Sequence, residues 1–116
     1  MLLFKKEKAS VTSLNFIFCS DEYLLEINQQ FLKHNFYTDI ISFNLAANNE
    51  PVEGEIYISL DRVRENAGEL NQSFKTELHR VIFHGALHLC GYMDKRPADI
   101  LLMRKKEDEY LKSYFK

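Results

Sequence analysis

The chain has 116 residues, 46% of them hydrophobic, and its 15 basic and 17 acidic side chains give a formal charge of -2 at pH 7. That length and composition suit one domain with one modest core, and the charge excludes a global attraction to nucleic acid. There is no segment of roughly 18 apolar residues, no secretory signal at the start and no paired cysteine spacing, so we expect a soluble cytoplasmic protein with reduced thiols.

The first half of the chain predicts two strands separated by a helix. Residues 14–19 are aromatic and β-branched, which is typical of a strand. Ser20 then offers a side-chain oxygen as a helix cap, and apolar residues recur at helical spacing until about residue 34. A second short strand is expected at 40–43, and the polar run 46–51 is expected to be a loop.

The second half predicts one strand followed by three helices. Residues 54–59 alternate as a strand does, and a helix is expected from about 60 to 70. A long helix from 74 to 90 follows its cap at Ser73, and Pro97 suits the first turn of a last helix. No repeat, low-complexity tract or linker divides the chain, so we predict a single domain over residues 1–116.

Two histidines in the long helix are the most informative residues. His84 and His88 are four residues apart, which places both imidazoles on one helix face, where they can bind one metal ion. Gly91 suits the end of that helix, and the chain then turns so that Asp94 can supply a third, oxygen ligand. A histidine inside a helix is more often a hydrogen-bonded core residue, but Gly91 and Asp94 favour the metal site.

The same frame resembles the long zinc-protease signature, with two departures. Gly85 stands where those proteases place a general-base glutamate, which disfavours peptide hydrolysis and leaves a protease as a weak third possibility. Asp94 in place of a third histidine keeps a three-ligand open site with an added negative charge. His79 lies about 140 degrees around the helix from His84 and is a poor ligand, whereas Glu77 is either an acceptor for a ligand or solvated.

The run HGALHLCGYMD from His84 to Asp94 resembles the hallmark of the YbeY family of bacterial metal-dependent endoribonucleases, His-Gly-x-Leu-His-Leu-x-Gly-Tyr-Asp-His. Upstream, residues 27–43 resemble the family's Leu-Asn helix and its Thr-Asp-Val-Leu-Ser-Phe strand, and residues 54–59 resemble its Gly-Asp-Ile strand. The resemblance implies an α+β fold, in which a small mixed sheet packs against about four helices and a metal site lies at the C-terminal end of a long helix.

The resemblance also implies a biochemical role. It implies one divalent metal ion, with zinc favoured, and hydrolysis of single-stranded RNA during maturation and quality control of ribosomal RNA. The expected partner is ribosomal RNA or the small ribosomal subunit, with no DNA and no membrane. The family's first strand and part of its first helix are expected to be absent from this chain.

Two departures from the family pattern touch the chemistry. The family's third histidine aligns with Asp94, and Leu32 occupies the position of an arginine that the family is proposed to use in engaging RNA. Leucine cannot hold a phosphate through a forked pair of hydrogen bonds. Four basic residues are the candidates to replace that arginine, and the sequence does not choose among them: Lys33, Arg62, Arg64 and Arg80.

The leading hypothesis is a metal-dependent endoribonuclease whose ion, held by the two histidines and the aspartate, activates water; the sequence identifies no general base. At the start of the second strand, Thr38, Asp39 and Ser42 either brace the cleft and orient a ligand or cap a turn. The competing hypothesis is a non-catalytic ribosome-associated protein whose metal site is structural or vestigial. Leu32 and Asp94 motivate that alternative.

Overall fold

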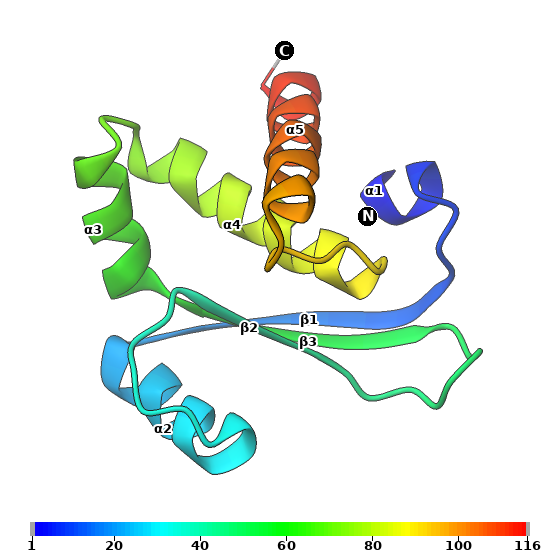
Figure 1. The fold of residues 1–116 in the computed structure, drawn as a ribbon, viewed down its shortest axis with the longest axis horizontal. Helices are drawn as coiled ribbons and strands as arrows, with labels where there is room; N and C mark the ends of the chain where they lie inside the picture. The colour runs from blue at the N-terminus through cyan, green and yellow to red at the C-terminus, as the bar shows by residue number, and fades with distance from the viewer. Residues whose placement is uncertain (1, 116) are drawn as a thin grey trace.

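A three-stranded mixed sheet is the framework of the computed structural model, which describes residues 2–115 (Figure 1). The strands are β1 (Val11–Cys19), β2 (Ile40–Asn44) and β3 (Val52–Ser59). β3 lies in the centre, paired parallel with β1 and antiparallel with β2. The predicted α+β class with a small mixed sheet is therefore confirmed.

Five helices are present in the described part of the chain, and they cover the two faces of the sheet unequally. They are α1 (Leu2–Lys6), α2 (Asp21–Leu32), α3 (Leu60–Glu69), α4 (Phe74–Leu89) and α5 (Pro97–Tyr114). Figure 1 shows α2 on one side of the sheet, with α4 on the opposite side and α5 resting on α4. Helix α4 therefore lies between the sheet and α5, which packs on part of its outer face.

The core under α4 follows from the alternation along β3. Ile56 and Ile58 are fully buried and pack with Val81 of α4 and Val63 of α3. Gly85 allows α4 to approach closely, because a Cβ atom there would lie 2.6 Å from Cδ1 of Ile40 and 3.1 Å from Cγ2 of Ile56. Residue 85 therefore faces the sheet, and its neighbour His84 points elsewhere.

Side-chain oxygens cap the helices where the sequence predicts it. The hydroxyl of Ser20 accepts from the Tyr23 N–H, and that of Ser73 accepts from the Thr76 N–H. At the other end of α4, Gly91 takes the left-handed conformation with φ of +100°, which favours glycine. This turn redirects the chain toward Asp94.

The predicted element bounds differ little from those observed. β1 and β3 begin three and two residues before their predicted starts at 14 and 54, and α2 ends at Leu32. Short helix α1 was not predicted; its Leu3 and Phe4 are buried, so packing holds it in place. Both cysteines are free and half-buried, and no helix among the described residues is long and apolar enough to cross a membrane.

Candidate metal centre

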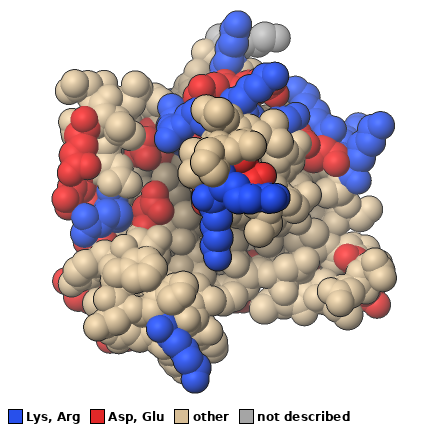
Figure 2. Space-filling view, in the orientation of Figure 1, with Lys and Arg blue, Asp and Glu red and all other residues tan. Residues whose placement is uncertain are grey.

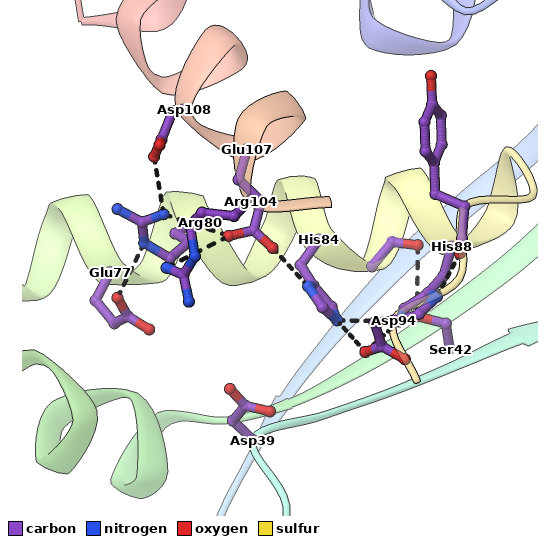
Figure 3. A network of polar contacts seen from close by, with 12 residues as sticks. Asp39, Ser42, Glu77, Arg80, His84, His88, Asp94, Arg104, Glu107 and Asp108 are labelled. Atoms are coloured by element: carbon purple, nitrogen blue, oxygen red, sulfur yellow. Dashed lines mark hydrogen bonds and ion pairs between the residues drawn. The ribbon is translucent and has the colours of Figure 1, made fainter. Parts of the chain in front are cut away.

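Three side-chain atoms converge at the C-terminal end of α4 (Figure 3). Nε2 of His84 and Nε2 of His88 are 3.0 Å apart, and each lies 3.2 Å from Oδ2 of Asp94. Ligand atoms around a tetrahedral zinc ion with bonds of about 2.1 Å are about 3.4 Å apart. The triangle therefore has the size that one metal ion requires, and these three residues could hold it.

The hydrogen bonds of the two imidazoles make both Nε2 atoms available as ligands. Nδ1 of His88 lies 2.8 Å from the carbonyl oxygen of Tyr92, which can only accept, so Nδ1 carries the proton. Nδ1 of His84 likewise donates to Oε2 of Glu107 over 2.6 Å. In neutral imidazoles the two Nε2 lone pairs then face each other and a carboxylate with no donor between them. A cation satisfies that arrangement.

Charges around His84 favour a positive group at this position. Burial lowers the pKa of His84, but the hydrogen bond and charge of Glu107, together with the charges of Asp94 and Asp39, raise it above its ordinary value. The same carboxylates that stabilise an imidazolium would stabilise a bound divalent ion. The donor set therefore fits a metal in charge as well as in spacing.

Glu107 is a site residue that the sequence did not reveal. It lies on α5, is only 4% exposed, and its second oxygen accepts from Nη1 of Arg80 over 3.3 Å. Arg80 also donates to Asp108 over 3.1 Å. The carboxylate that orients His84 is thus fixed between a histidine and an arginine of α4, and only the packing of α5 on α4 brings it there.

Glu77 was predicted either to accept a hydrogen bond from a ligand histidine or to be solvated, and it does neither. It is 3% exposed, and its carboxylate lies 3.4 Å from Nε of Arg80, so it is neither solvated nor bonded to a histidine. Burial raises the pKa of Glu77. Glu77 therefore helps to surround Arg80, while Glu107 contacts the candidate ligand.

A polar cleft of about 300 Å³ opens beside the three candidate ligands. Asp39 lines it together with His84, Asp94, Arg80 and Arg104. Burial raises the pKa of Asp39, although the nearby charge of His84 opposes this shift. The cleft thus places a carboxyl group of raised pKa and two arginines next to the candidate metal ligands.

The structure separates the three polar residues that were grouped at the start of β2. Only Asp39 lines the cleft, where its carboxylate is 3.4 Å from the amide nitrogen of Asn66. Ser42 is 3.5 Å from the Gly85 carbonyl oxygen and so links β2 to α4 beside His84. Thr38 contacts the Ile40 carbonyl oxygen at 3.4 Å, within its own turn. Their distances favour a cleft role for Asp39 and a local structural role for Thr38.

The positions of Gly85, His79 and His34 exclude a general base at residue 85 and further histidine ligands. A side chain at Gly85 would meet the sheet, so a glutamate there has no room to act on water near the histidines. His79 lies outside the triangle, with Nδ1 2.7 Å from the Lys75 carbonyl oxygen. His34 is exposed and stacks on Phe36.

Comparison with known proteins gives consistent matches. A family model described as "Endoribonuclease YbeY" matches residues 1–115. The curated endoribonuclease YbeY of Flavobacterium psychrophilum is 56% identical over 108 residues, spanning 93% of this chain and 76% of the relative. The protein of that name from Cytophaga hutchinsonii is 53% identical over 107 residues, spanning 92% of this chain and 75% of the relative.

A solved structure matches the fold as well. The solution structure of TM1509 from Thermotoga maritima superposes with a TM-score of 0.67 at 37% sequence identity. The match covers 95% of this chain and 72% of that chain.

Proposed function

Because the chain belongs to the YbeY family of endoribonucleases, which are hydrolases, we propose that it cleaves single-stranded RNA with the help of one divalent ion, zinc first among the candidates. His84, His88 and Asp94 would hold that ion. The observation that carries the proposal is the convergence of three lone-pair donors whose hydrogen-bond partners leave no proton between them.

The side chains around the cleft would have different roles in such a metal-dependent site. A bound divalent ion would polarise a phosphodiester oxygen and increase the acidity of water. Glu107 and the Tyr92 carbonyl oxygen keep the two imidazoles in the tautomer that presents Nε2. Asp94 contributes negative charge, which tightens binding of a cation but makes that cation a weaker Lewis acid. Asp39 lines the cleft, and it is the one residue of the β2 group that we assign to the site.

The biological setting is proposed from the family resemblance alone. We propose that the RNA is ribosomal RNA, that the protein works on or near the small ribosomal subunit, and that it does so in the cytoplasm. The formal charge of -2 argues against a broad affinity for nucleic acid. Recognition would then depend on a local group of basic side chains near the cleft.

Leu32 and Asp94 keep a second function in contention, in which the same ion is structural and no bond is cleaved. Leu32 is uncharged, so it offers no cation to a phosphate. It is 41% exposed at the end of α2 and is not among the residues that line the cleft. Restoring arginine at Leu32 together with histidine at Asp94 separates the two. A large gain in RNA cleavage over an inactive wild type would identify a degraded site.

The direct test is an RNA cleavage assay on purified protein in three states: as reconstituted with zinc, after chelation, and after zinc is returned. The proposal predicts cleavage of single-stranded RNA that chelation abolishes and zinc restores, with no cleavage by His88→Ala. A single-stranded DNA of matching sequence should stay intact. Absence of RNA cleavage in every state, in a protein that binds zinc, would favour the structural-metal alternative.

A further inference from the structure

Three of the four basic residues considered in place of an arginine at Leu32 lie outside the cleft. Arg62 donates to Asp21 over 2.8 Å, and Arg64 lies over the Phe74 ring at 5.1 Å from its centroid. Lys33 ends α2 as its left-handed C-cap. None of the three lines the cleft.

Arg80 does line the cleft, but carboxylates surround its guanidinium. It lies 3.3 Å from Glu107, 3.1 Å from Asp108 and 3.4 Å from Glu77, and its side chain is only 16% exposed. Moving it toward a substrate would break the contact that fixes Glu107 behind His84. Arg80 is therefore suited to hold the site together, and a phosphate needs another partner.

Arg104 is the cleft-lining cation that remains available. Its side chain is 57% exposed, and within the described part of the chain it makes one ion pair, a long one of 3.8 Å to Glu107. Residues three apart on a helix share a face, so Arg104 sits one turn before Glu107 on the side of α5 that meets His84. Figure 3 shows the Arg104 side chain beside that of Arg80 and next to the Glu107 carboxylate.

The charge around the cleft gives this arginine a reason to bind an anion. The cleft is lined by three carboxylates, those of Asp39, Glu77 and Asp94, and by two arginines, Arg80 and Arg104. Carboxylates already surround Arg80, so Arg104 is the cation of this lining that can pair with an entering phosphate. Figure 2 shows lysine and arginine side chains gathered over α5 and the loop before it. Their exposed members include the following residues: Lys95, Arg96, Arg104, Lys105 and Lys112. The exposed acids Asp108 and Glu109 lie on the same helix, so these basic side chains attract a phosphate backbone only locally.

We propose that Arg104 binds a phosphate group of single-stranded RNA beside the candidate metal ligands and so positions the chain for cleavage. The proposal rests on the proposed function and assigns to α5 the phosphate contact that Leu32 cannot make. A guanidinium suits this role because its forked donors bind two phosphate oxygens together. Arg104 acts as a positioning residue, and the bond that breaks lies next to the phosphate it holds.

The test is equilibrium binding of a short fluorescein-labelled oligouridine to zinc-reconstituted protein, followed by fluorescence anisotropy over a range of salt concentrations. Arg104→Gln removes the proposed contact, and Arg104→Lys keeps the charge without the fork. Lys5→Gln is the matched control, because Lys5 is exposed on α1 and does not line the cleft. Gel electrophoresis of each sample checks that the RNA stays intact, and metal analysis checks that zinc is retained.

We expect Arg104→Gln to weaken RNA binding about tenfold and to reduce the slope of log affinity against log salt by about 0.7, the change for one lost phosphate contact on a single strand. Arg104→Lys should retain the slope with weaker binding, and Lys5→Gln should match wild type. An unchanged slope in Arg104→Gln, or an equal loss in Lys5→Gln, would overturn the assignment. Wild-type protein that binds RNA through Arg104 but cleaves none would refute the proposed function alone.

Discussion

Replacing Glu107 with glutamine should weaken metal binding without unfolding the protein. The carboxylate is 4% exposed, accepts from Nδ1 of His84 over 2.6 Å and balances the charge of Arg80. Glutamine has the same shape but no charge, so it holds the imidazole less firmly and makes its Nε2 a poorer electron donor. Loss of such a partner typically reduces metal affinity 10- to 100-fold, or about 1.4–2.7 kcal/mol.

The assay is competition for zinc between the protein and a chromogenic chelator. Glu109→Gln is a suitable control, because Glu109 lies on the same helix with a side chain that is 52% exposed and pairs only at 3.8 Å with Lys106. We expect the control to bind zinc as wild type does. Undiminished zinc affinity in a folded Glu107→Gln protein would refute the argument that Glu107 tunes His84.

Three further predictions concern stability and the cleft. Burial raises the pKa of Glu7, but hydrogen bonds from two tyrosines and a lysine lower it by more. The stability that the Glu7 carboxylate contributes is therefore present above pH 4.5 and is lost as the pH falls through the lower pKa of the folded state. Glu7→Gln should therefore cost about 2 kcal/mol at neutral pH in urea unfolding and much less in acid; an equal cost at both would contradict this. Gly85→Val should destabilise by about 1–3 kcal/mol because it clashes with Ile40, whereas Gly68→Ala, with open space around it, should stabilise by about 0.5–1 kcal/mol; the reverse order in thermal unfolding would exclude the packing argument. Asp39→Asn should leave neutral-pH stability unchanged or higher, because burial already disfavours the charged carboxylate, while it reduces zinc content or RNA cleavage; loss of stability alone would remove Asp39 from the site.

The secondary structure could be predicted because its signals are local. Caps at Ser20 and Ser73 and the glycine at 91 act through their own turns, and the periodicity of each segment reports which face is buried. Helix α1 was not predicted because its five residues carry little periodic signal and because the helix depends on the burial of Leu3 and Phe4. The observed start of β1 precedes the predicted one for a similar reason, because pairing with β3 extends the strand beyond its aromatic run.

The residues of the candidate site also differ in whether local sequence could predict them. His84 and His88 share a helix face by spacing alone, and the turn at Gly91 returns Asp94 to them, so sequence reasoning could propose all three. Glu107 is 23 residues beyond His84, and its contact depends on how α5 crosses α4, which no local pattern encodes. Arg104 belongs to a mixed run of charges that resembles a solvated helix face, and only the fold places it at the cleft.

The central claim is a metal ion held by His84, His88 and Asp94, and elemental analysis of protein purified without a histidine tag tests it most directly. Wild type, His84→Ala and Asp94→Ala are compared, each before and after reconstitution with zinc. We expect close to one ion per wild-type chain and loss of that ion in both variants, with the fold retained. Metal that survives in Asp94→Ala, or a wild type that takes up none even with added zinc, would contradict it.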